Sequence, residues 1–200
     1  MSNFSYEIKI PKDRIAVLIG KKGELKKQIE EETKTKIDVD SQEGDVVVSG
    51  EDAVLLFATR ELIKAIARGF NPDIAMQLLK QDMVFELLDI SDFARSKKDM
   101  IRLKGRVIGN DGKSRRVIES LTDCSICVYG KTIGLIGKVE WVPIAKKSIE
   151  SLLSGSPHSS VYTWLERKRK ETKREDLNIN DMKDFVKEEY FKDLEDIKKI

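Results

Sequence analysis

Two short glycine motifs are the residues of this chain best suited to chemistry. The first is Gly20-Lys21-Lys22-Gly23 and the second is Gly109-Asn110-Asp111-Gly112. Glycines at both ends of a short turn let the backbone approach a sugar-phosphate chain closely, because glycine has no Cβ. A helix that begins after such a turn directs unpaired N–H groups and the positive end of its dipole at a phosphate. The two motifs therefore indicate sites that clamp the backbone of a nucleic acid.

Basic side chains surround both motifs, but the central pairs differ in charge. Lys21 and Lys22 place two cations beside a phosphate, whereas Asp111 places a carboxylate there, which repels a phosphate at short range. Either flanking cations still hold a strand at the second loop, with Asp111 turned outward, or that loop now contacts a protein. The residues that we predict to bind the nucleic acid are Ile19, Gly20, Lys21, Lys22, Gly23, Lys26, Lys27, Arg102, Lys104, Arg106, Gly109, Asn110, Gly112, Lys113, Arg115 and Arg116.

Other reactive side chains are few. Cys124 and Cys127 have the spacing of half a zinc site, but the chain has no further cysteine and one histidine, His158, so the second half of such a site is missing. Residues three apart on a strand point to opposite faces, and ordinary packing of both cysteines is the simpler interpretation. We expect a helix cap or a surface contact for His158. No nucleophile is paired with a base, and we predict neither an enzyme nor a cofactor or metal.

Composition limits the class of protein further. The 200 residues include 37 Lys and Arg against 35 Asp and Glu, a net charge of +2, which excludes a histone-like polycation but allows a local basic face. No apolar run approaches the roughly 20 residues of a membrane-spanning helix. The first residues lack the pattern of a secretory signal, and two cysteines suit a reducing compartment. We expect a cytoplasmic protein with no membrane contact.

The chain contains an internal repeat. When residues 19–39 are aligned with residues 108–128, eight of 21 positions are identical. The shared residues are the two glycines, apolar positions of a helix with a glutamate and a threonine, and alternating residues of a strand. The repeat indicates a duplicated domain.

Each copy predicts the same order of strand, helix, helix, strand, strand and helix. In the first copy, hydrophobic periodicity places these elements at 4–10, 13–19, 24–33, 36–40, 45–49 and 51–68. In the second copy they fall at 84–90, 100–107, 113–122, 125–129, 132–136 and 139–153.

This order, with Ile-Gly-x-x-Gly between the first two helices, resembles the KH RNA-binding domain, in which the glycine loop clamps backbone nucleotides. The resemblance implies an α+β protein of two tandem type I KH domains, with β-α-α-β-β-α in each. We assign residues 1–70 and 82–155 to these domains and 71–81 to a helical linker. The linker is short and apolar, so we expect the domains to be docked together. A C-terminal helical extension follows, with a basic helix over 156–175 and an amphipathic helical tail over 176–200 that packs on its own core or on a partner.

A narrower resemblance lies in the second copy and after it. The segments 112–119 and 128–132, followed by 155–166 with its Gly-Ser-Pro-His-Ser-Ser-Val-Tyr run, are similar to a family of archaeal ribosome-biogenesis KH proteins. This family is related to the eukaryotic factor called partner of Nob-one. The resemblance covers residues 4–174. It implies binding near the 3′ end of small-subunit rRNA, with the maturation endonuclease and the initiation factor two alpha subunit as partners.

Two other functions stay open. One is a generic binder of single-stranded RNA or DNA that regulates transcripts. The other is a protein scaffold whose KH folds no longer bind nucleic acid, which Asp111 favours and Lys21 and Lys22 oppose.

Overall fold

The structure is a computed structural model that describes residues 4–172 and 174. The first half of the chain forms an antiparallel sheet in the order β1-β3-β2, covered on one face by helices. Its elements are β1 (Phe4–Lys9), α1 (Lys12–Ile19), α2 (Glu24–Thr33), β2 (Lys36–Val39), β3 (Asp45–Gly50) and α3 (Ala53–Ala67). The order predicted for the first copy is confirmed.

The second half repeats this architecture with a sheet in the order β4-β6-β5. Its elements are β4 (Met83–Asp89), α5 (Lys97–Ile108), α6 (Lys113–Thr122), β5 (Ser125–Tyr129), β6 (Thr132–Lys138) and α7 (Val142–Leu153). Helix α5 begins three residues earlier than its periodicity predicts, because the Ser96 hydroxyl accepts a hydrogen bond from Asp99 N at 3.2 Å and caps the helix.

The segment between the two halves is not one helix. It consists of α4 (Pro72–Ala75), which the Asn71 side chain caps, and the 3-10 turn η2 (Met76–Leu79). Ala75 and Leu78 are buried in the first core, so this segment packs against the first domain as its apolar residues predict.

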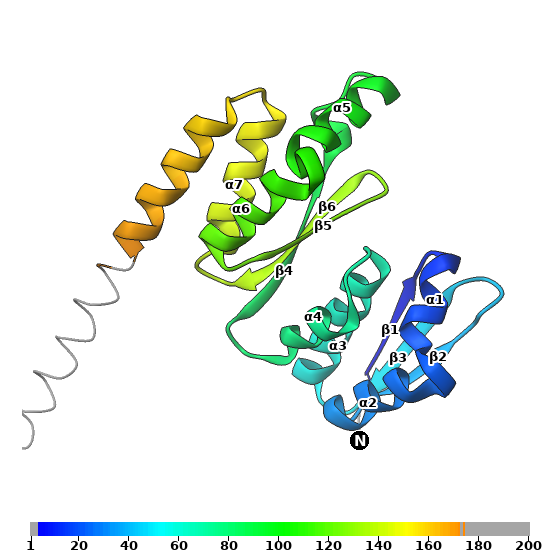
Figure 1. The fold of residues 1–200 in the computed structure, drawn as a ribbon. Helices are drawn as coiled ribbons and strands as arrows, with labels where there is room; N and C mark the ends of the chain where they lie inside the picture. Colours follow the sequence, from blue (N-terminus) through cyan, green and yellow to red (C-terminus); the bar gives the residue numbers. More distant parts are fainter. Residues whose placement is uncertain (1–3, 173, 175–200) are drawn as a thin grey trace, which may run out of the picture.

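The second sheet is buried on both faces, which explains the apolar run along β6. Ile133 and Leu135 point into the second core, whereas Ile136 belongs to the core of the first domain. Successive residues of a strand point to opposite faces. In Figure 1 the helices of the second domain lie on one side of this sheet and the first domain on the other.

Three contacts hold the first domain against this sheet. Phe70 is 2% exposed and meets Phe85 edge to face, with ring centroids 6.0 Å apart. Gly134 of β6 makes room for Phe70, because a Cβ there would lie 2.5 Å from the Phe70 ring. The Tyr129 hydroxyl donates a hydrogen bond to Asp13 at 2.6 Å. The prediction of a docked pair is confirmed.

The cysteines separate to the two faces of the second sheet, as their spacing predicts. Cys124 is buried in the second core, and burial raises the pKa of its thiol to about 11. Cys127 packs against the first core, and burial raises its pKa as well. Within residues 4–172 and 174, no group of three or more metal-ligating side chains occurs.

A further helix over residues 158–172 follows α7. Val161 and Leu165 are buried in the second core, and Arg169 contacts Ser120 O and Asp123 at the end of α6. The predicted amphipathic tail over 176–200 lies outside the described residues. In the described part of the chain, no helix has both the length and the apolar character to cross a membrane.

Candidate nucleic-acid interface

The first glycine loop is a tight turn between α1 and α2 with a defined backbone path. Gly20 has φ 73° and ψ −178°, Lys22 has φ 52° and ψ 23°, and Gly23 has φ 79° and ψ 11°. The Gly20 conformation is essentially restricted to glycine, whereas the left-handed conformation of the other two residues is tolerated by a few residue types.

The two glycines of this loop have different reasons to be there. A Cβ on Gly20 would lie 2.7 Å from Leu25 Cβ, so the loop closes on the first turn of α2. A Cβ on Gly23 would meet nothing within 4 Å. The space outside Gly23 is therefore open to a ligand that approaches the backbone at the start of α2.

The cations of the first loop face solvent. Lys21, Lys22 and Lys27 are exposed, and Lys26 is half-buried with its ammonium 3.8 Å from Glu30. A surface of this kind attracts a phosphate backbone. Ile19 is half-buried and packs against the first core, so it supports the loop from below.

The second loop has the same backbone path. Gly109 has φ 74° and ψ 176°, Asp111 has φ 49° and ψ 31°, and Gly112 has φ 74° and ψ 13°. A Cβ on Gly109 would lie 2.6 Å from both Ser114 Cβ and Ser114 N, and one on Gly112 would meet nothing within 4 Å. The duplicated motif thus gives two turns of one geometry.

A cation compensates the acidic residue of the second loop. The Arg116 guanidinium donates to the main-chain carbonyl of Asp111 at 2.7 Å, which holds this cation against the loop. Asn110, Asp111 and Lys113 are exposed. Arg115 lies 3.7 Å from Glu119, and its Nε has no hydrogen-bond partner in the described part of the chain. The loop therefore carries one carboxylate among three cations.

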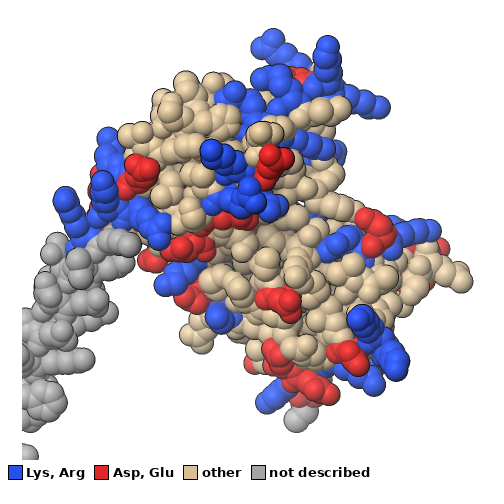
Figure 2. Space-filling view, in the orientation of Figure 1, with Lys and Arg blue, Asp and Glu red and all other residues tan. Residues whose placement is uncertain are grey.

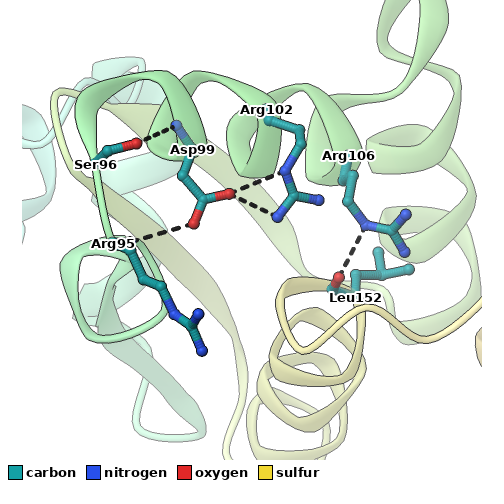
Figure 3. Close-up of polar contacts among 6 residues, drawn as sticks. All are labelled: Arg95, Ser96, Asp99, Arg102, Arg106 and Leu152. Atoms are coloured by element: carbon teal, nitrogen blue, oxygen red, sulfur yellow. Dashed lines mark hydrogen bonds and ion pairs between the residues drawn. The ribbon is translucent and has the colours of Figure 1, made fainter.

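Figure 3 shows that the Arg106 side chain points toward Leu152, near the end of α7. Its guanidinium donates to Leu152 O at 3.0 Å and to Ser156 O at 2.7 Å, and so caps the end of α7. In the first domain Arg14 does the same for α3, through Ile66 O at 2.8 Å and Phe70 O at 2.7 Å. Two of the five N–H donors of Arg106 are used in this cap, so the residue has a structural role, and its contact with a nucleic acid stays a prediction.

Arg102 and Lys104 lie on α5, before the second loop. Arg102 donates two hydrogen bonds to Asp99, at 2.9 and 2.6 Å (Figure 3), and this pairing holds the pKa of the Asp99 carboxyl below its usual value. Lys104 is half-buried. The other predicted residues gather at the two loops and at the first turns of α2 and α6.

Two glutamates that we did not predict shape the interface. Glu30 accepts a hydrogen bond from Ile37 N at 2.7 Å, and Glu119 accepts one from Ile126 N at 2.9 Å. Each ties the second helix of its domain to the neighbouring edge strand, beside the cation four residues before it. Their identity in both copies of the repeat was the signal that could have found them.

Charge on the surface is uneven. Figure 2 shows Lys and Arg gathered over the upper end of the second domain and beside the start of the segment drawn in grey. The helix over 158–172 contributes Arg167, Lys168, Arg169 and Lys170 there, although Lys168 and Arg167 are partly offset by Glu171.

Comparison with known proteins agrees with this geometry. Residues 84–170 match the model of the eukaryotic type KH domain (type I), and residues 5–68 match that of the KH domain. A KH domain-containing protein of Methanocaldococcus jannaschii is 46% identical over 189 residues, which cover 92% of this chain and 83% of that protein. The RNA-binding protein PNO1 of Oryzias latipes is 34% identical over 114 residues, which cover 56% of this chain and 47% of that protein.

A solved structure is also similar to this chain. Dim2p of Pyrococcus horikoshii, in a complex with the initiation factor subunit a/eIF2alpha and rRNA, is 44% identical with a TM-score of 0.80. The similarity covers 84% of this chain and 96% of that chain.

Proposed function

The chain belongs to the archaeal PNO1-like family of tandem KH proteins, and from this premise we propose that it is a cytoplasmic RNA-binding adaptor in small-subunit biogenesis. It holds single-stranded rRNA near the 3′ end of the small-subunit rRNA, with one glycine loop of each domain on the strand. It brings the maturation endonuclease and the initiation factor two alpha subunit to that site.

The observation that carries this proposal is the identical backbone path of the two loops. In each, the second glycine leaves open space outside the start of a helix, whose positive dipole end attracts a phosphate. Docking through Phe70 and Tyr129 holds both loops on one body. The rRNA and the initiation factor subunit in the complex of the Pyrococcus horikoshii relative support the same partners for this chain.

Crosslinking in cell extract, followed by sequencing of the bound RNA, tests the target. Reads confined to the 3′ region of small-subunit rRNA support the adaptor. Reads scattered over many transcripts favour a general regulator, and the absence of RNA favours a protein scaffold.

The first loop is tested by changing Lys21 and Lys22 to Asp. Both side chains are exposed, so the fold should persist, while affinity for single-stranded rRNA should fall. Each phosphate contact on a single strand contributes about −0.7 to the slope of log K against log salt, so the double variant should lose about 1.4 from that slope. The matched control is Lys34→Asp with Lys36→Asp. These two exposed lysines follow α2 in the sequence, whereas the loop precedes it. An unchanged slope would mean that the first loop does not clamp the backbone.

A further inference from the structure

A groove of about 260 Å³ lies behind the second loop, between the start of α6 and the helix over 158–172. Its lining residues are Gly109, Asn110, Lys113, Ser114, Val117, His158 and Tyr162. Val117 lies three and four residues after Ser114 and Lys113, so it is a neighbour of both on the helix surface, and all three fall within about 100° of one another around α6. Arg115, Arg116 and Glu119 fall on the opposite side. The groove is therefore distinct from the surface that Glu119 ties to β5.

The aromatic wall of this groove is held in place. His158 Nε2 lies 2.9 Å from Arg106 O, in hydrogen-bond contact. The ring of Tyr162 lies 6.0 Å from the His158 ring, tilted by 59°. The surface that the groove offers to a ligand is almost entirely apolar. A wall of this kind suits the flat face of an aromatic ring, and each nucleobase has such a face.

A buried hydroxyl in the same groove has no partner. Ser114 is 3% exposed, and its Oγ makes no hydrogen bond to any described residue. A hydroxyl left in this state is costly, since buried polar groups normally find partners. The first domain has Leu25 at the equivalent position, half-buried against its own core. The fold thus accepts an apolar residue here, and serine is not needed for packing.

The polar rim completes the requirements of a nucleotide. Lys113 is exposed at the first turn of α6, next to the open side of Gly112, where a phosphate would sit. Asn110 is exposed on the rim and offers an amide to the edge of a base. None of the lining residues carries a carboxylate.

We propose that this groove is a nucleotide subsite, which takes one base of the single strand that crosses the second loop. The base lies on Tyr162 and the Ser114 hydroxyl bonds to it, while its phosphate lies at the loop beside Lys113. The proposal rests on the RNA-binding function proposed above. It adds a contact that the first domain lacks, because Leu25 replaces the serine there.

The test measures the affinity of the full chain for a labelled single-stranded fragment of the small-subunit rRNA 3′ end. Tyr162→Ala should weaken binding about tenfold, within the range for loss of one stacked base, whereas Tyr162→Phe should keep it. Trp164→Ala is the matched control, an aromatic residue of the same helix that does not line the groove. Trp164→Ala should leave the RNA affinity within about twofold of the wild type. A larger decrease would mean that removing an aromatic side chain from this helix weakens binding in itself, without loss of a stacked base.

A second variant guards against loss of folding. Ser114→Leu places in the groove the residue that the first domain already carries, so unfolding by denaturant should be unchanged or shifted to higher concentration while RNA affinity falls. An abasic site scanned along the fragment should abolish the effect of Tyr162→Ala at one position, because that base is then already absent. If both variants bind like the wild type, or if no abasic position cancels the loss, the subsite does not exist. Failure of the wild-type chain to bind the fragment would instead refute the proposed function.

Discussion

The two glycines of each loop should respond differently to substitution by alanine. The first is needed to fold the turn, so its variant should lose stability, and the second leaves room for the ligand, so its variant should lose RNA affinity. Gly109→Ala puts a side chain at φ 74° and ψ 176°, with its Cβ 2.6 Å from Ser114 N. That backbone region costs about 1–3 kcal/mol for a non-glycine residue, and the overlap with main chain adds to it. We expect the free energy of unfolding to fall by about 3 kcal/mol.

Gly112→Ala should behave differently. Its conformation, φ 74° and ψ 13°, is left-handed, and its Cβ meets nothing within 4 Å. Asp111 next to it, and Lys34 and Asp123 elsewhere, already adopt positive φ in this chain. The free energy of unfolding should fall by only about 1 kcal/mol. RNA affinity should fall at least about tenfold, because the new methyl group holds a phosphate away from the start of α6 and from the Lys113 ammonium, and hydrogen bonds to charged groups contribute about 1.5–3 kcal/mol.

Denaturant unfolding and titration with labelled single-stranded rRNA measure the two quantities on the same preparations. The pair Gly20→Ala and Gly23→Ala repeats the comparison in the first domain, where the first Cβ would lie 2.7 Å from Leu25 Cβ and the second meets nothing within 4 Å. Equal losses of stability for the two glycines of a loop, or an unchanged affinity for Gly112→Ala, would refute the reasoning.

Three further predictions concern the second loop, the docked interface and a buried cysteine. Asp111→Lys should tighten RNA binding by about 1 kcal/mol at this exposed position, and Arg115 and Arg116 changed to Ala should weaken it; unchanged titrations for both variants would remove the second loop from the interface. Gly134→Ala should destabilise the docking of the two domains by about 1–3 kcal/mol. The half-buried Cys127 in the interface should then be modified faster by a thiol reagent, and a rate equal to that of the wild type would contradict this prediction. Cys124 has its pKa raised by burial from 9.0 to about 11. The folded chain therefore keeps this proton while the unfolded chain loses it, and the free energy of unfolding should decline as pH rises between these values. Unfolding scans at each pH measure this decline, and a constant free energy over that interval would contradict the prediction.

Much of the fold could be predicted because duplication makes weak signals agree. A single Gly-x-x-Gly run is common, but two of them in one order of elements indicate one fold. The helix boundaries were less certain where a cap decides them. Ser96 starts α5 three residues before the first apolar position that periodicity marks, and hydrophobic spacing carries no information about such a cap.

The candidate site was harder to predict, because a basic residue has the same appearance in sequence whether its donors are free or occupied. Arg106 stands close to the loop along the chain, but its acceptors belong to Leu152 and Ser156, about four dozen residues away. The groove behind the second loop also depends on residues that are distant in sequence, because Tyr162 reaches it from a helix that follows the second domain. Contacts of this range are set by packing, which local patterns do not record.

The docked interface has a consequence for how a strand is held. Because Phe70 lies against Gly134 and Tyr129 bonds to Asp13, the distance between the two loops does not vary as it would on a flexible tether. A strand bound at one loop therefore meets the other at a high effective concentration, without the entropy loss of ordering a linker. Avidity of this kind depends on the number of nucleotides between the two contacts. The pair of domains should act as a molecular ruler, favouring one spacing in the RNA over both shorter and longer ones.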